Sequence, residues 1–105
     1  MSIRDRQEGF EKKFAMDEET KFKAMARRNK LLGLWAAEKL GKTGTDADAY
    51  AKEVVQADFE EAGDNDVFRK VRTDFDTAGV VLSDTQIRSI MDELLVTAVE
   101  QIKNN

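Results

Sequence analysis

The feature that most constrains the fold is a long helix-forming stretch, residues 22–40. It contains no proline and one glycine, and most of its other residues favour a helix, so it predicts a helix of about five turns. Apolar residues recur along one side at the helical period: Phe22, Met25, Leu32, Ala36 and Leu40. This stripe is expected to face the core. Leu31, Leu34 and Trp35 add apolar surface on other sides, so the helix is expected to be the central element of a helical bundle.

Glycines and capping residues indicate where the next helices begin and end. Gly41 and Gly44 are expected to end the first helix, and Thr45 is expected to cap a second helix that runs to Gly63. Asp64 is expected to cap a third, short helix. Apolar residues recur at the helical period in both segments and predict that each helix has one buried face.

The last helix is predicted after Gly79. Ser83 and Gln86 have the spacing of a capping box, in which each side chain bonds the other residue's backbone N–H. The helix carries the strongest apolar stripe of the chain: Ile87, Ile90, Met91, Leu94, Leu95, Ala98, Val99 and Ile102. Leu94 is expected to be buried within it. Short connections favour antiparallel neighbours, so the sequence predicts an all-α four-helix bundle with a long first helix and an amphipathic N-terminal arm.

The arm, residues 1–16, has a pattern of its own. Ile3, Phe10 and Phe14 lie on one narrow stripe, but the next positions along that line are charged. The core stripe of the first long helix is rotated from it by most of a quadrant, and residues 16–19 are expected to form a kink, a hinge or a frayed segment. We therefore predict two units, the arm and a bundle of residues 17–105.

Two interpretations of the arm remain open from its periodicity. It is either an ordinary first turn packed on its own bundle, or a helix that fits a groove on another protein. The rotated stripe and Gly9, which weakens a helix by about 1 kcal/mol, favour the second interpretation, a helix that binds another protein. So do the flanking charges Arg4, Arg6, Lys12 and Lys13.

Composition excludes several classes of protein and site. The 105 residues include no cysteine, histidine or proline, so disulfides, thiolate metal sites and histidine-based catalysis or pH sensing are absent. The longest nearly uninterrupted apolar run, residues 31–37, is too short to span a bilayer, and the N-terminus has no signal-peptide pattern. A cytoplasmic location is expected.

Net charge is unevenly distributed along the chain. Residues 1–40 hold ten Lys and Arg against seven Asp and Glu, and the remainder holds seven against fourteen, giving +3 and −7 within an overall −4. Residues 21–30 carry five cations and no acid. Overall acidity and the expected lack of interleaved exposed aromatic residues nevertheless argue against nucleic-acid binding.

Patterns that would indicate an enzyme have simpler explanations. Gly41, Lys42 and Thr43 match the end of a phosphate-binding loop, but residue 36 is alanine where the pattern needs glycine, and the segment follows a helix instead of leading into one. No nucleophile–base pair is visible. Trp35 is interpreted as a core or half-buried side chain.

Five segments carry a resemblance to a known family: residues 26–38 (ARRNKLLGLWAAE), 49–55, 57–63, 67–71 and 91–95. They resemble the ATPase inhibitor zeta subunit family of alphaproteobacterial F-type ATP synthases, and the resemblance covers essentially the whole chain. It implies a four-helix bundle that binds the catalytic head of the F-type ATP synthase and blocks ATP hydrolysis. In that family the N-terminal segment inserts between catalytic subunits and the central rotor.

The resemblance places the inhibitory residues in the arm. Taken with the arm's own pattern, it gives the expected partner-binding set: Ile3, Arg4, Asp5, Arg6, Phe10, Lys13 and Phe14. Family members also bind ADP or ATP, so such a nucleotide is expected as a regulatory ligand, without assigned residues and with no cofactor required. Met16 stands where relatives carry histidine.

The chain is therefore expected to be an inhibitor and not an enzyme. We expect it to be monomeric when free, not inserted in a membrane, and located at the cytoplasmic face of the inner membrane when bound to ATP synthase. The alternatives are a small helical adaptor or nucleotide-sensing module with another protein partner, and an RNA-binding bundle.

Overall fold

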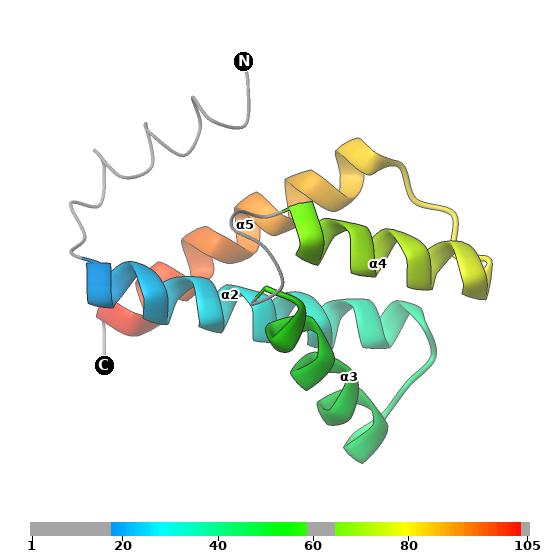
Figure 1. Cartoon of the computed structure of the whole chain (residues 1–105), viewed down its shortest axis with the longest axis horizontal. Coiled ribbons are helices and arrows are strands. Elements are labelled where there is room, and N and C mark those ends of the chain that lie inside the picture. Colours follow the sequence, from blue (N-terminus) through cyan, green and yellow to red (C-terminus); the bar gives the residue numbers. More distant parts are fainter. Residues whose placement is uncertain (1–17, 59–64, 104–105) are drawn as a thin grey trace.

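A computed structural model of the chain describes residues 18–58 and 65–103, and these form four α-helices. They are α2 (Glu18–Lys39), α3 (Gly44–Ala57), α4 (Asn65–Ala78) and α5 (Asp84–Lys103), shown in Figure 1. The prediction of an all-α fold with a long first helix is confirmed. The arm lies outside the described residues, so its amphipathic helical character stays a prediction.

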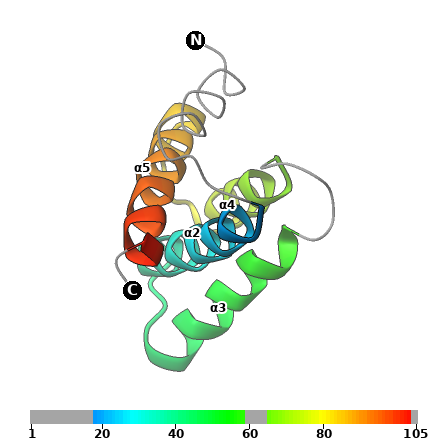
Figure 2. The same cartoon turned by 90° about the vertical axis from the view of Figure 1, so that its left-hand side faces the viewer.

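The principal contacts between helices are those of α2 with α3, α3 with α4, α4 with α5, and α5 with α2. Figure 2 shows α3 and α5 on opposite sides of α2. The closest packing in the bundle is that of α2 against these two helices. This agrees with the prediction that α2 is the central element.

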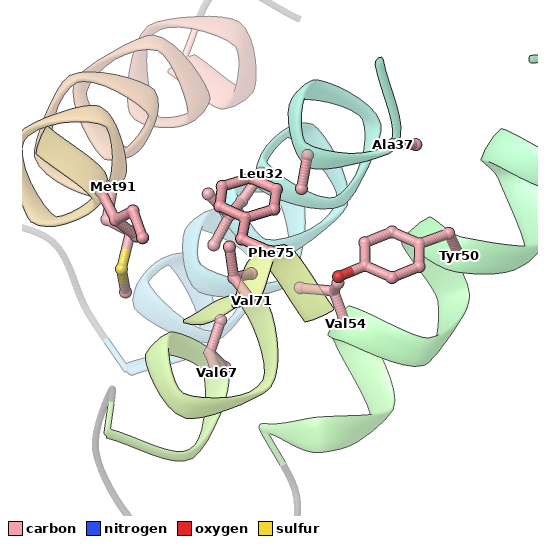
Figure 3. Close-up of a cluster of buried hydrophobic side chains, with 10 residues drawn as sticks. Leu32, Ala37, Tyr50, Val54, Val67, Val71, Phe75 and Met91 are labelled. Atoms are coloured by element: carbon pink, nitrogen blue, oxygen red, sulfur yellow. The ribbon is translucent and has the colours of Figure 1, made fainter. Parts of the chain in front are cut away.

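The core lies between the four helices and draws side chains from each of them. It consists of Leu32, Ala36, Ala37, Tyr50, Val54, Val67, Val71, Phe75, Ile87 and Met91. Figure 3 shows the valines and the phenylalanine of α4 pointing toward α2. Trp35 is half-buried against this cluster and meets Phe75 edge to face, with ring centroids 5.6 Å apart. The interpretation of Trp35 as a packing residue is confirmed.

Gly33 allows α2 and α3 to approach closely. A Cβ atom built on Gly33 would lie 2.5 Å from the Cα atom of Ala51, a distance that side chains do not tolerate. Both residues are buried. The single glycine of the long helix is therefore a contact residue, and it determines how near α3 can come.

Local signals located three helix ends correctly. The Ser83 backbone N–H donates to Gln86 Oε1 at 2.8 Å, and the Gln86 N–H donates to Ser83 Oγ at 3.1 Å, which confirms the capping box. Gly41 and Gly79, just after α2 and α4, have φ angles of 78° and 75°. This left-handed conformation favours glycine and ends a helix.

Both ends of α3 differ from the prediction, because the helix was expected to run to Gly63 and it ends at Ala57. The helix begins at Gly44, and its N-cap is Thr43, not Thr45. The Thr43 carbonyl accepts the first helical bonds, from Asp46 N–H at 3.2 Å and Ala47 N–H at 3.4 Å, while its side chain makes no capping bond. Both Thr43 and Thr45 are residues that can cap a helix, and the backbone hydrogen bonds of α3 start from Thr43. Asp64, the predicted cap of α4, lies outside the described residues.

The prediction that Phe22 faces the core is wrong, because its side chain is 64% exposed. Phe22 is seven residues before Asn29 and fourteen before Ala36, so all three lie on one side of α2, and the other two are buried. Val55 of α3 lies near Ala26, and α3 ends two residues later. The helical period therefore identified the correct side, but the covering helix ends before it reaches Phe22.

The prediction for Leu94 is also wrong, because this residue is only half-buried. The buried residues of α5 are Ile87, Met91, Ala98 and Val99. At about 100° per residue, Leu94 lies just outside the arc that these four span. It packs against the margin of the core, where α2 and α4 do not enclose it.

Substituting Gly33 by alanine tests the close approach of α2 and α3, because the packing decides whether the free energy of unfolding rises or falls. At a solvent-exposed position of a helix, a Gly→Ala substitution stabilises the folded protein by up to about 1 kcal/mol. Here we expect a lower free energy of unfolding, because the added Cβ would lie 2.5 Å from Ala51 Cα and push α3 away. Urea denaturation followed by circular dichroism measures the difference. Ala49→Gly, at an exposed position of α3, reports helix propensity alone. Stabilisation by Gly33→Ala would contradict the packing described.

Two alanine substitutions in α5 test which of its side chains are buried. Met91 is 1% exposed, so Met91→Ala should lower the free energy of unfolding by about 2–5 kcal/mol. Leu94→Ala should lower the free energy of unfolding clearly less, because part of its side chain is already in contact with water. The two unfolding free energies are measured under the same conditions. Equal losses would mean that Leu94 is as much a core residue as Met91.

Candidate interaction site

The residues predicted to bind the partner lie outside the part of the chain that the structure describes. These are Ile3, Arg4, Asp5, Arg6, Phe10, Lys13 and Phe14. Their role in binding stays a prediction. The structure does describe the surface to which the arm is joined, the first three turns of α2 and the ends of α3 and α5 beside them.

An apolar hollow lies beside Phe22. We call it the Phe22 hollow. It has a volume of about 640 Å³ and is lined by Phe22, Lys23, Ala26, Arg27, Lys30, Val55 and Ile102. Ala26, Val55 and Ile102 are half-buried and form its apolar part together with the exposed phenyl ring. Three helices far apart in sequence therefore contribute to one surface.

The charged residues that line the Phe22 hollow are all cationic. Lys23, Arg27 and Lys30 are exposed, and the described part of the chain contributes no acid to the lining. Lys23 Nζ lies 3.1 Å from Glu19 Oε1, one turn earlier on the same helix. Arg27 Nη1 donates to Gln101 Oε1 at 3.1 Å and so links α2 to the end of α5. The surface presents a positive rim around apolar side chains.

A second hollow adjoins the first along α2 and α3. Its volume is about 540 Å³, and its lining is Lys30, Asp48, Ala51, Lys52, Val55 and Gln56. We call it the Lys52 hollow. It shares Lys30 and Val55 with the Phe22 hollow. Two lysines, one carboxylate and one amide surround a floor of small apolar side chains, which is a suitable setting for an anionic ligand with an apolar part.

Arg28 shows that the basic run of α2 is not all surface. Its side chain is 1% exposed, and its Nε donates to Asn29 Oδ1 at 2.8 Å. Asn29 is equally buried, and its Nδ2 has no hydrogen-bond partner. Sequence reasoning treated this run as a block of cations. The spacing of Arg28, four residues after buried Ala24 and four before buried Leu32, was the signal that it faces inward.

Tyr50 forms a polar link between α3 and α4. Its hydroxyl donates to Asp74 Oδ2 at 2.7 Å, and Lys70 Nζ donates to the same oxygen at 3.0 Å while lying 5.1 Å from the ring centroid. Burial and then the bond to Asp74 raise the pKa of Tyr50 far above its usual value of about 10. The phenol is therefore neutral near pH 7, and it serves here as a hydrogen-bond donor between helices.

The described residues bring together no metal site. Across residues 18–58 and 65–103, no group of three or more carboxylates is placed to hold an ion. Among the four described helices, none combines the length and the apolar character needed to cross a membrane.

Comparison with known proteins identifies the family. A family model described as ATPase inhibitor subunit zeta matches residues 1–101, which is nearly the whole chain. The chain belongs to the ATPase inhibitor zeta subunit family. The resemblance seen in the sequence is thereby confirmed, and the match to the zeta subunit model includes the arm as well as the bundle.

A solved structure supports the fold of this zeta subunit. A solution NMR structure is 52% identical in sequence, with 79% of this chain and 94% of that chain covered, and its TM-score is 0.71. No curated protein matches the chain. The family supports a regulatory role as an inhibitor of ATP synthase.

Proposed function

We propose that this protein inhibits ATP hydrolysis by the F-type ATP synthase through its N-terminal arm. The observation that carries the proposal is that the zeta subunit family model matches the chain from residue 1 to residue 101. The arm, residues 1–16, would insert between the catalytic subunits and the central rotor of the enzyme's head. The bundle, from residue 17 onward, would remain outside as the folded body that carries it.

The sequence of the arm supports this division of roles. Ile3, Phe10 and Phe14 form a stripe, and burial of each such side chain in a groove contributes about 1.5–3 kcal/mol. The charges of Arg4, Arg6 and other arm cations would orient the arm and speed its encounter with an acidic surface. Bound in this way, the protein would lie at the cytoplasmic face of the inner membrane.

We propose ADP or ATP as a regulatory ligand, with no nucleotide required for the inhibitor to fold. The Lys52 hollow supports this, because Lys30 and Lys52 could bind phosphates while Ala51 and Val55 contact the base. Titration calorimetry with each nucleotide tests it. Tight nucleotide binding without any binding to the ATPase head would favour the alternative, a nucleotide-sensing module with another partner.

Replacing the two aromatic residues of the arm tests the inhibitory role. Phe10→Ala and Phe14→Ala together, or deletion of residues 2–16, should abolish inhibition of ATP hydrolysis by the isolated cognate head. Neither change should unfold the bundle, because the buried residues of the described structure begin at Ala24. Activity is assayed over a range of inhibitor concentrations, and folding is followed by circular dichroism.

The matched control replaces two apolar residues exposed elsewhere on the bundle. Val81 is 95% exposed and Val96 is 38% exposed, and neither lines a hollow described above. The double variant Val81→Ala and Val96→Ala should inhibit as the unmodified chain does. A truncated protein that stays folded and still inhibits fully would refute the role of the arm.

Inhibition should vary little between pH 6 and pH 8. The chain has no histidine, and the raised pKa of Tyr50 keeps its phenol protonated throughout this range. Because folding raises that pKa, its contribution to stability is complete below about pH 10 and is lost only as pH rises beyond it. Inhibition constants measured at several pH values, each referred to the uninhibited enzyme, check this. A steep pH dependence traced to the inhibitor would contradict it.

A further inference from the structure

Phe22 is an exposed aromatic side chain at a defined place on the molecule. It is 64% exposed and projects from the side of α2 that is buried further along the helix. Its neighbours in the Phe22 hollow, Ala26, Val55 and Ile102, are themselves only half-buried. Aromatic residues surrounded by apolar groups and a polar rim are typical of the energetic centre of a protein interface.

The position of Phe22 in the chain limits what can cover it. It follows Phe14 by eight residues, which span about 12 Å as a helix and at most about 28 Å when extended. If Phe14 lies inside the catalytic head, Phe22 must lie close to the enzyme surface around the point where the arm goes in. A partner engaged by the arm is therefore brought to the Phe22 hollow by the covalent chain itself.

The charge of the hollow specifies the chemistry of that surface. Among residues 18–58 and 65–103, the charged residues that line it are Lys23, Arg27 and Lys30, and none is an acid. The Arg27 guanidinium is held in place by its bond to Gln101, so one cation of the rim is oriented by the fold. An apolar patch bordered by carboxylates would complement this surface in both shape and charge.

We propose that the Phe22 hollow is a second anchor of the inhibitor, which docks on an apolar, carboxylate-bordered surface of the same catalytic head. This rests on the proposed function and extends it. The arm blocks the enzyme, whereas Phe22 and its cationic rim hold the bundle against the outside of the head and slow dissociation. Loss of the anchor shortens the lifetime of the complex but leaves the blocking arm intact.

The test uses the full chain and the isolated cognate head, with dissociation followed by biolayer interferometry. Phe22→Ser should accelerate dissociation at least about tenfold, while inhibition at saturating inhibitor remains complete. Val81→Ser makes the same kind of change at a 95% exposed site on the α4–α5 connector and should leave dissociation within about twofold of the unmodified chain. Circular dichroism verifies that both variants are folded.

A charge reversal provides an independent measurement of the same surface. Lys30→Glu, at the rim of the hollow, should slow association several-fold at low salt, and the difference should shrink as ionic strength rises. Lys39→Glu reverses an equally exposed cation in the last turn of α2 and should have little effect.

The possible results separate this inference from the proposed function. If Phe22→Ser dissociates as slowly as the unmodified chain, or if Val81→Ser accelerates dissociation equally, the second anchor is refuted. Self-association of the unmodified chain in sedimentation experiments, abolished by Phe22→Ser, would assign the hollow to a second copy and also refute it. If the unmodified chain does not inhibit the head at all, the proposed function fails first.

Discussion

The close approach of α2 and α3 at Gly33 determines much of the remaining structure. Because Gly33 has no side chain, Ala51 can lie against the α2 backbone, and this contact places Val54 and Tyr50 in the core. It also sets the register of the two helices. With Ala51 opposite Gly33, Val55 near the end of α3 lies close to Ala26, and α3 does not extend over Phe22. One glycine thus influences both the core and the exposed surface beside the arm.

In the proposed mechanism, the four helices provide the stability and the arm provides the inhibitory contact. The buried residues of the described structure start at Ala24, and the core is completed by all four helices. Polar links such as Tyr50 to Asp74 and Arg27 to Gln101 connect neighbouring helices near the surface. The core therefore needs no side chain from before Ala24 among the described residues, which is consistent with the proposal that the arm serves a partner.

The cations of α2 illustrate two opposite uses of charge. Lys23 and Lys30 are exposed and give a positive end to a protein that is acidic overall. Arg28 is buried beside Asn29, whose Nδ2 has no partner, and both groups lose their hydration when the bundle folds. Such burial stabilises little by itself, because desolvation offsets the attraction that a buried charge gains. The fold thus places some cations of this run on the surface and one in the interior, where it makes a polar contact.

The sequence by itself determined the class of the fold, three of the helix ends and the family. Capping by Ser83 and Gln86 and termination at Gly41 and Gly79 are local events, involving residues within one turn of each other, so local patterns suffice. Only the tertiary structure decided that Phe22 is exposed, that Leu94 is half-buried and that Arg28 is buried. The helical period tells which side a residue faces, but not how far the neighbouring helix extends along that side. For the same reason the Phe22 hollow could not be foreseen, since it is formed by α2, α3 and α5 only where α3 and α5 end.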